Sequence, residues 1–365
     1  MYLFSNSLIF LFFLLHIAVI FIGMAIAYTN SKHCDNLGVL LVAVVYFALN
    51  LTRTGLGVDE PVYLEAYKDY IQQGILHFEY SFNAVYYLLS IANVGPEYFN
   101  ITISTLFIIF SITMIVKCVE RPYRTIGLVF FLFFSITLDF IFNAYRQGLA
   151  FLFVALSLHY YSVNRKRMSL LMFIIGLGFH WSSIVVAIAI FLCRFISIRL
   201  AMRLNIAIIF LTLVAALVPL KIIPLISKIL FIGSFGSPYI LKITRYLDSP
   251  IAYFYDLNML GRMPLIISVI ATLLYVYIYR NFIPEFLYKL IIVLMVYCLL
   301  FLEMSYSFRN YYWVLPLMPL IMANTPCFVQ SNRAKRSVLF VAFLFHVILS
   351  ITGYYTSGIM PMIFA

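Results

Sequence analysis

A stripe of polar residues interrupts the long apolar stretch in the middle of the chain. In a continuous helix Asp139, Asn143, Arg146 and Gln147 share one face, which also includes Ala150. An arginine at bilayer depth normally faces a cavity or a partner, because its charge is costly to bury in lipid. Its planar guanidinium suits phosphate or carboxylate. The stripe therefore predicts an anion site, and a structural pairing of Arg146 with Asp139 is an alternative that can coexist with it.

Two other places carry groups that could accept a proton from a hydroxyl. Asp59 lies two residues after Gly57, where the chain leaves the membrane, and a carboxylate that reaches an attacking group can act as a general base. Its carboxylate can point back at the cavity, whereas we expect Glu60 and Glu65 to face water or the loop interior. The alternative is a solvated acidic loop. His180, beside two serines, is the other candidate; a lone histidine in an apolar run is otherwise a hydrogen-bonded packing residue.

Basic residues with aromatic neighbours recur later in the chain. Arg309 precedes two tyrosines and a tryptophan, which is also the composition of an ordinary interfacial belt. Lys242 and Arg245, followed by Tyr246, could contact either lipid headgroups or an anion.

The composition indicates which solvent surrounds these groups. Of 365 residues, 65% are apolar and 10% are charged, against about 25% charged residues in soluble domains. A chain with so few charges could not cover its surface in water, so we expect lipid to surround most of it. The net charge of +11 comes from short basic clusters between apolar runs, which is typical of membrane proteins and argues against nucleic-acid binding.

The apolar runs predict an all-α polytopic membrane protein, with residues 1–365 as a single integral membrane domain. Ten spans are predicted, at residues 7–28, 37–52, 98–116, 123–139, 140–163, 204–220, 263–279, 286–302, 311–326 and 337–353. We expect the first to be a span and not a cleaved signal, because it is long and has no basic leader.

Charge assigns the sides of the membrane. One side holds 15 of the 24 Lys and Arg but three of the 13 acids, with basic clusters at residues 117–124, 165–167, 194–203 and 333–336. These loops are predicted to be cytoplasmic. Both termini and two long loops, at residues 53–97 and 221–262, then lie outside. The sequence therefore predicts an outward-facing polar cavity that handles a phosphate-bearing substrate at the outer leaflet.

Residues 169–193 break this alternation, because basic clusters flank both ends of one apolar run. Two short helices hinged at Gly176, Gly178 and His180 would keep both flanks inside, and each would be too short to cross. Re-entrant backbone is tolerated where it is buried in protein or lines a wet cavity. We predict such a hairpin here, with one straight span as the alternative.

The sequence predicts no metal site and no cofactor. The five cysteines show neither CxxC nor CxxH spacing: Cys34, Cys118, Cys193, Cys298 and Cys327. Four of them fall at predicted cytoplasmic helix ends, where thiols stay reduced, so we expect no disulfide. No metal motif of the DxD type is present, so arginines would take the place of a divalent ion.

Five short motifs in a fixed order resemble the EpsG-like family. They are G-x-D-x3-Y at Gly57, Asp59 and Tyr63; N-x2-R-Q-x-x-A from Asn143 to Ala150; F-H-x-S from Phe179 to Ser182; K-x3-Y at Lys242 and Tyr246; and F-R-x-Y-Y from Phe308 to Tyr312. The second motif followed by the third is the most specific part, and the resemblance covers nearly the whole chain.

The family contains membrane proteins of bacterial exopolysaccharide, capsule and O-antigen clusters, and it is grouped with the Wzy polysaccharide polymerases. The resemblance implies a glycosyltransferase of the bacterial inner membrane, with about ten transmembrane helices and a fold like the GT-C membrane glycosyltransferases. It would polymerise oligosaccharide repeat units linked to undecaprenyl diphosphate. Donor and acceptor are then lipid-linked, and a chain-length regulator is a further expected partner.

The resemblance also implies roles for particular residues. In the GT-C class an acid on the first outer loop acts near the acceptor, which corresponds to Asp59, and His180 is the other candidate base. The expected diphosphate ligands are Arg146, Arg309, Arg245 and Lys242. We expect supporting roles for Asn143, Gln147, Asp139, Tyr63 and Tyr246.

Other functions remain open from the sequence. A flippase or transporter of lipid-linked sugars also needs buried arginines but no base, and an assay of chain growth separates it from a polymerase. A single-addition membrane glycosyltransferase, or an acyltransferase acting on polysaccharide, is a third possibility. Acyltransferases of that kind depend on a histidine and an acid early in the chain, and here His16 stands alone.

Overall fold

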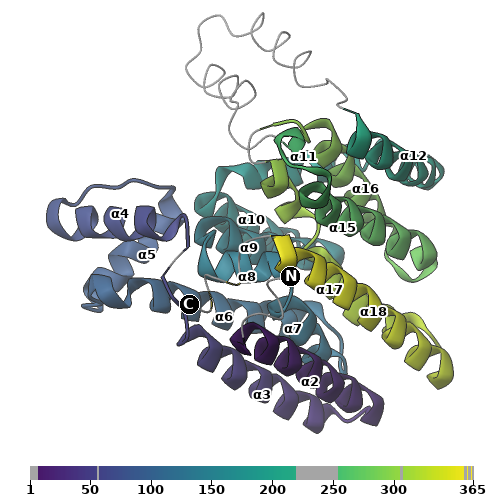
Figure 1. The fold of residues 1–365 in the computed structure, drawn as a ribbon, viewed down its shortest axis with the longest axis horizontal. Coiled ribbons are helices and arrows are strands. Elements are labelled where there is room, and N and C mark those ends of the chain that lie inside the picture. Colours follow the sequence, from purple (N-terminus) through teal and green to yellow (C-terminus); the bar gives the residue numbers. More distant parts are fainter. Residues whose placement is uncertain are drawn as a thin grey trace, which may run out of the picture. The chain divides into compact units, whose positions relative to one another are not determined.

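The computed structural model describes residues 7–55, 57–218, 254–304, 307–356, 360 and 363, and these residues form helices and no strand (Figure 1). Six of the described helices are long and apolar enough to cross a membrane. They are α2 (Ser7–Thr29), α3 (Lys32–Asn50), α6 (Phe99–Cys118), α12 (Ile198–Leu217), α15 (Met259–Ile278) and α18 (Asn332–Thr356). The all-α, multi-pass membrane class is therefore confirmed, whereas ten spans and a likeness to GT-C enzymes stay predictions.

The chain divides into two compact units, Met1–Ile184 with Pro316–Ala365 (the first unit) and Val185–Leu315 (the second unit). The remaining helices of the first unit are α4 (Glu60–Gln73), α5 (Tyr80–Ile91), α7 (Arg124–Leu132), α8 (Ser135–Phe142), α9 (Tyr145–Ser162), α10 (Lys166–Phe179) and α17 (Leu317–Asn324). The second unit adds α11 (Ile184–Leu192) and α16 (Glu285–Leu300). The expectation of one integral membrane domain stays a prediction.

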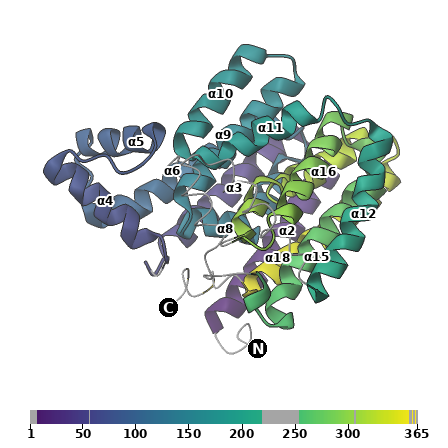
Figure 2. The same ribbon diagram turned by 90° about the horizontal axis from the view of Figure 1, so that it is seen from above.

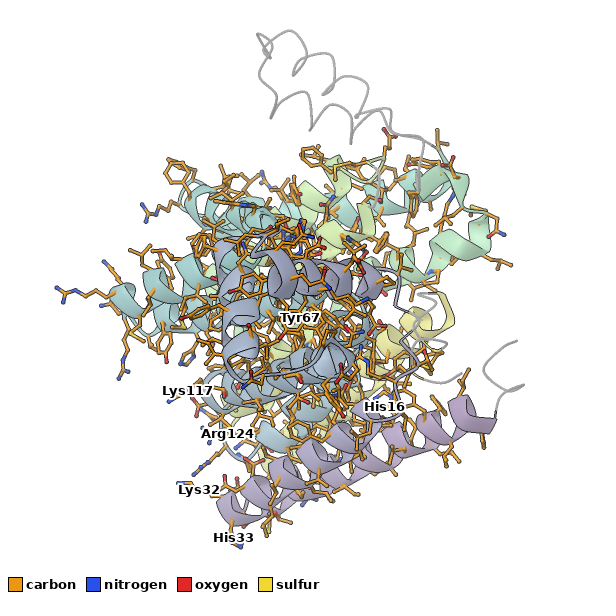
Figure 3. The ribbon with its side chains drawn as sticks, turned by 90° about the vertical axis from the view of Figure 1, so that its left-hand side faces the viewer. His16, Lys32, His33, Tyr67, Lys117 and Arg124 are labelled. Carbon is orange, nitrogen blue, oxygen red and sulfur yellow. The ribbon has the colours of Figure 1, made fainter. Side chains whose placement is uncertain are left out.

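Basic residues gather at one end of the first unit. Figure 3 shows Lys32, Lys117 and Arg124 at this end, from the start of α3, the end of α6 and the start of α7. A fully buried carboxylate joins the start of α3 to the start of α7, because Asp35 accepts hydrogen bonds from the backbone nitrogen and the hydroxyl of Thr125, both at 2.9 Å. Since α3 and α6 run in opposite directions, the end of α3 and the start of α6 meet at the other end of the unit.

The first outer loop, predicted at residues 53–97, contains two helices. Figure 1 shows α4 and α5 together beside the start of α6. Aromatic rings fill the space between them: Tyr67 stacks on Phe99, and Tyr86 packs against both. The hydroxyl of Tyr67 donates to the carbonyl of Val94 at 2.8 Å. The loop is therefore a folded cap at this end of the unit. Burial raises the pKa of Tyr86 above its ordinary value.

The span predicted at residues 123–139 is broken. Helices α7 and α8 meet at an angle of 67°, which leaves carbonyl groups at the break without helical partners. Tyr46 on α3 donates to the carbonyl of Leu132 at 2.6 Å, and Tyr354 on α18 donates to that of Phe133. In lipid such carbonyls must be satisfied within the protein. The two tyrosine hydroxyls meet that requirement. Hydrogen bonds from α3 and α18 therefore stabilise the break.

A second break separates α8 from α9, four residues beyond the boundary that the sequence predicts. The chain leaves helical geometry at Asn143 (φ −148°, ψ −67°), and α9 begins at Tyr145. Asp139 and Arg146 therefore do not share the face of one continuous helix, and that expectation is wrong.

His16 is not alone in the interior of the first unit. Its Nε2 lies 2.9 Å from Nε2 of His346 on α18, and both side chains are buried. The rings stack on Phe133 and Phe130 at 4.8 and 4.6 Å. His16 thus pairs with a histidine 330 residues later, which joins α2 to α18; this partner is not the early acid that an acyltransferase would need.

The apolar run at residues 169–193 is divided at His180, whose backbone is extended (φ −156°, ψ 118°). Helices α10 and α11, of 14 and 9 residues, are both shorter than a span needs, about 20 residues. Gly176 and Gly178 lie inside α10 and are not hinges. A Cβ at Gly178 would collide with the Tyr80 ring, so this glycine serves the packing of α5 on α10. The reversal of direction stays a prediction, because most of α11 belongs to the second unit.

The span predicted at residues 311–326 is also irregular. A 3-10 helix (Ser307–Trp313) precedes α17, which has eight residues and is followed by a second 3-10 helix (Thr325–Phe328). Pro316 stands before α17 and Pro326 ends it, since proline lacks the backbone donor that a continuing helix requires.

In the second unit, α12, α15 and α16 lie side by side (Figure 2). Asn205 on α12 joins all three, because its side-chain amide donates to the carbonyl of Leu273 and to the hydroxyl of Tyr288, at 3.3 and 3.2 Å. At another point Arg262 donates to the carbonyls of Ala216 and Tyr255, which fixes the start of α15 beside the end of α12.

The predicted reversal at His180 can be tested by cysteine labelling. We expect Lys166→Cys and Arg199→Cys, each in a cysteine-free background, to react with a membrane-impermeant maleimide from the cytoplasmic side, because the hairpin keeps both flanks inside. Labelling of the two positions from opposite sides would contradict the hairpin and favour a crossing.

Candidate functional site

The polar residues that the sequence singles out in the first unit lie at the end opposite to Lys32, Lys117 and Arg124. The end of α3, the starts of α4, α5, α6 and α9, and the end of α10 all meet there. These elements are held together by hydrogen bonds between side chains and backbone that are far apart in the sequence. Two neighbouring ion pairs organise the site.

The first ion pair joins Arg53, just after α3, to Glu60 at the start of α4. The two side chains are 10% and 3% exposed, so the charges are out of water. Arg53 also donates to the hydroxyls of Tyr145 and Ser104 and to the carbonyl of Asn100, the last at 3.0 Å. Tyr145 donates to Glu60 at 2.6 Å. This network joins α3, α4, α6 and α9 at one point.

The buried carboxylate of Glu60 also fixes the bend that precedes it. Its Oε2 accepts a hydrogen bond from the backbone nitrogen of Gly57 at 2.9 Å. A Cβ at Gly57 would collide with the carbonyl oxygen of Phe142, so only glycine fits here. We expected Glu60 to face water or the loop interior; instead it faces Arg53. Burial lowers the pKa of Arg53 and the Tyr145 hydroxyl opposes that shift, and the guanidinium stays protonated.

Asp59 is held at the site through its backbone. Its nitrogen donates to Oδ1 of Asn143 at 2.7 Å, and Nδ2 of Asn143 donates to Asp139 at 3.0 Å. Asp139 and Asn143 are buried, whereas Asp59 is half-buried. Asp59 occupies the N-cap position of α4, but its carboxylate makes no capping hydrogen bond. The break at Asn143 therefore presents an amide to the first outer loop.

The second ion pair joins Arg146, in the first turn of α9, to Glu79 at the start of α5. Nη1 of Arg146 donates to Oε2 of Glu79 at 2.7 Å, and the side chains are 25% and 7% exposed. The guanidinium carbon lies 4.4 Å from the ring centre of Phe78 and 5.8 Å from that of Tyr63. The structural partner of Arg146 is thus Glu79, and Asp139 accepts its hydrogen bond from Asn143.

The turn that begins at His180 approaches this second ion pair in space. The backbone nitrogen of Trp181 approaches Oε1 of Glu79 at 3.4 Å, and Nδ1 of His180 lies 3.2 Å from the hydroxyl of Ser182. Glu79 therefore links the start of α9 to the turn after α10. The motifs that contain Arg146 and His180 meet through this acid.

The structure brings together part of the predicted set. Those that meet in the first unit are Asp59, Tyr63, Asp139, Asn143, Arg146, Gln147 and His180, with Gln147 buried in the first turn of α9. Arg309 belongs to the second unit, so its proximity to Arg146 stays a prediction. Lys242, Arg245 and Tyr246 lie outside the described residues.

Four residues of the site escaped the sequence analysis: Arg53, Phe78, Glu79 and Tyr145. A signal existed for two of them. Arg53 is one of few basic residues on the predicted outer side, and it directly follows a predicted span, where a buried counter-charge is needed. Tyr145 directly precedes Arg146, and this adjacency is the signal for the tyrosine. Glu79 and Phe78 are 67 and 68 residues from Arg146, and no periodicity connects them.

Among the described residues, no three His, Cys, Asp or Glu side chains are grouped so that they could hold a metal ion. The expectation that the protein uses no metal or cofactor stays a prediction.

Comparison with known proteins identifies the family. The model of the EpsG family matches residues 36–363, nearly the whole chain, and the chain belongs to this family. The resemblance seen in the five motifs is thereby confirmed, and it supports a membrane protein of the polysaccharide-polymerase type. No curated protein and no solved structure matches the chain.

The Arg53–Glu60 pair should be essential for stability. Glu60→Gln leaves Arg53 buried without a counter-charge, and loss of one partner of a buried pair costs about 3–5 kcal/mol. We expect a lower midpoint of thermal unfolding for the purified full chain in detergent. The matched control is Glu65→Gln, which removes a carboxylate that is 68% exposed and pairs with Lys68 at the surface.

A second variant distinguishes the ion pair from a general effect of mutation. Arg53→Met combined with Glu60→Gln removes both charges, so it should unfold at a higher temperature than Glu60→Gln alone. Equal midpoints for Glu60→Gln and Glu65→Gln would contradict the role given to the pair.

Proposed function

We propose that this EpsG-family protein polymerises oligosaccharide repeat units carried on undecaprenyl diphosphate, at the outer leaflet of the bacterial inner membrane. A hydroxyl of the acceptor unit would attack the anomeric carbon of the donor sugar. The bond from that carbon to the diphosphate would break, and undecaprenyl diphosphate would leave with the electron pair. The product would serve O-antigen, capsule or exopolysaccharide synthesis.

The observation that carries this proposal is the placement of Arg146. Its guanidinium is partly exposed, in a cluster with the half-buried Asp59 and the turn at His180, at the end of the first unit opposite to the basic cluster that contains Lys32. Cytoplasmic loops carry the excess of Lys and Arg, which supports an outward-facing site. A phosphate attached to a membrane lipid would meet Arg146 near the boundary between lipid and water.

Arg146 supplies the electrostatic part of the proposed mechanism. A fixed cation at the diphosphate stabilises the negative charge that develops as the glycosidic phosphate bond breaks, which is usually the largest catalytic contribution. Phe78 and Tyr63 flank the guanidinium and restrict its orientation, so little reorganisation is needed. We propose that Arg309, Arg245 and Lys242 add further positive charge.

Asp59 is the proposed general base, with His180 as the alternative. The hydrogen bond from its nitrogen to Asn143 fixes the backbone of Asp59 at the site, beside the place that we propose for the acceptor hydroxyl. A base in this position would remove the proton from the hydroxyl as the new glycosidic bond forms. A transporter would need the arginine but no base, so the effect of removing this carboxylate separates the two functions.

Replacing Arg146 by Lys keeps the charge and loses the planar fork. We expect polymer formation to fall at least tenfold, as for a lost contact of about 1.4 kcal/mol or more. The measurement is the polysaccharide ladder of a deletion strain that expresses the variant, with membrane abundance matched to wild type. Normal ladder formation in Arg146→Lys would contradict the phosphate role.

Asp59→Asn tests the base. It should leave donor binding nearly unchanged and slow elongation by about 10²- to 10⁴-fold, the usual contribution of a general base. Donor affinity and elongation rate must be measured separately on the purified variant, with Glu65→Gln as the control. Weaker donor binding with normal turnover would place Asp59 among the binding residues and transfer the role of base to His180.

A further inference from the structure

Two aromatic residues are exposed where the start of α5 meets the turn that follows α10. Tyr80 is the first residue of α5, and Trp181 begins the 3-10 helix after His180. They are 50% and 59% exposed. Tryptophan is on average a highly buried residue, so a ring as open as that of Trp181 needs an explanation. The proposed mechanism uses neither ring.

Both residues adjoin the carboxylate that pairs with Arg146. Tyr80 follows Glu79 in the chain, and the backbone nitrogen of Trp181 approaches Oε1 of Glu79 at 3.4 Å. Oε2 of the same carboxylate accepts the hydrogen bond from Arg146 at 2.7 Å. The two exposed rings therefore belong to residues beside the place proposed for the diphosphate.

The ring of Tyr80 is fixed in position by α10. Its hydroxyl donates to the carbonyl of Ile174, and the ring lies so close to Gly178 that a Cβ there would collide with it. The next residue, Ser81, donates to the carbonyl of Ile175 at 3.0 Å. A tyrosine that anchors a protein at the lipid boundary directs its hydroxyl to water or headgroups. The hydroxyl of Tyr80 is bonded within the protein instead, so the exposed part of this side chain is its ring.

We propose that Tyr80 and Trp181 form a sugar-binding platform, on which sugar rings of the lipid-linked oligosaccharide stack. This rests on the proposed function, in which Arg146 binds the diphosphate of the donor. The first sugar of the donor is bonded directly to that diphosphate, so the sugars nearest to it lie close to Arg146 and Glu79. The face of an aromatic ring carries partial negative charge, and the C–H groups of a sugar ring present partial positive charge to it.

An exposed tryptophan at the outer end of a membrane protein is also typical of the interfacial belt. The two roles differ in what touches the ring. In the platform the ring of Trp181 contacts water until a sugar covers it, whereas in an anchor it contacts the acyl chains of the lipid at all times. The two environments give different quenching of tryptophan fluorescence, which makes the roles separable by experiment.

The chain contains two tryptophans, so Trp181 can report its own contacts. Trp313 is buried, and a change of emission that is present in wild type and absent in Trp181→Phe comes from Trp181. The probe is an oligosaccharide of a few repeat units, released by partial hydrolysis from the polysaccharide of the same bacterium and free of the lipid diphosphate. Titration of this probe into the purified full chain in detergent should give a saturable change in Trp181 emission.

Tyr80 should contribute to the same binding. We expect Tyr80→Leu to raise the Kd of the probe about fivefold because a stacked ring is lost, and Tyr80→Phe to stay close to wild type because the ring is kept. The control is Tyr98→Leu, which removes a ring of similar exposure (61%) just before α6. A wild-type chain without a saturable signal, or equal Kd values for Tyr80→Leu and Tyr98→Leu, overturns the proposal. If Tyr80→Leu does not fold, calorimetric titration of Trp181→Leu replaces it, and a wild-type Kd in that variant has the same meaning.

Quenching separates the platform from the anchor. The platform predicts that iodide in water quenches Trp181 and that the bound probe shields it. In bilayers of phospholipids brominated on their acyl chains, strong quenching of Trp181 that the probe does not reduce would make this residue a lipid anchor and overturn the proposal.

The platform and the proposed function can fail separately. If Arg146→Lys gives a normal polysaccharide ladder while the probe still changes Trp181 emission, the phosphate role of Arg146 is wrong and the sugar-binding surface stands. If Arg146→Lys loses the ladder while the probe leaves Trp181 unchanged in wild type, the platform alone is wrong.

Discussion

The buried ion pair between Arg53 and Glu60 is the interaction on which the candidate site depends. Charges out of water are tolerated only where their hydrogen-bonding groups find partners. Here the pair recruits Tyr145, Ser104 and the bend at Gly57, so that four helices converge on one point. Asp59 follows that bend directly, and Arg146 follows Tyr145. The two residues proposed to do chemistry are therefore each next to a residue of the network in the chain.

Residues with proposed roles and residues that organise the site are thus interleaved along the chain. Glu60 stabilises the fold and Asp59 is half-buried beside it; Tyr145 donates to the ion pair and Arg146 reaches Glu79. The helix breaks at residues 133 and 143 are both held by hydrogen bonds from other segments of the chain. At the first break the hydroxyls of Tyr46 and Tyr354 donate to freed backbone carbonyls. At the second break the side chain of Asn143 accepts a hydrogen bond from the backbone nitrogen of Asp59.

The sequence predicted the helical membrane class and the family, because these depend on composition and short motifs. The role of Arg146, which rests on the cost of one charge in lipid, stays a prediction. The sequence did not predict what Arg146 binds within the protein. Periodicity assigned Asp139, since it assumes an unbroken helix, and the helix breaks at Asn143. The true partner, Glu79, is brought close by the packing of α5 on α10, which depends on tertiary contacts such as those of Ser81 and Gly178. The sequence also predicted single spans at residues 123–139 and 311–326, where the structure has the short helices α7 and α17, because periodicity assumes an unbroken helix there too.

The central claim is that this protein lengthens a lipid-linked polysaccharide. The most direct test is to reconstitute the purified chain in bilayers with undecaprenyl-diphosphate-linked repeat units and to resolve the products by length. The account predicts products of many repeats, with one undecaprenyl diphosphate released for each new bond, and no such products with Arg146→Lys at equal abundance. Movement of the repeat unit across the bilayer without growth, or growth that stops after a single addition, would contradict it.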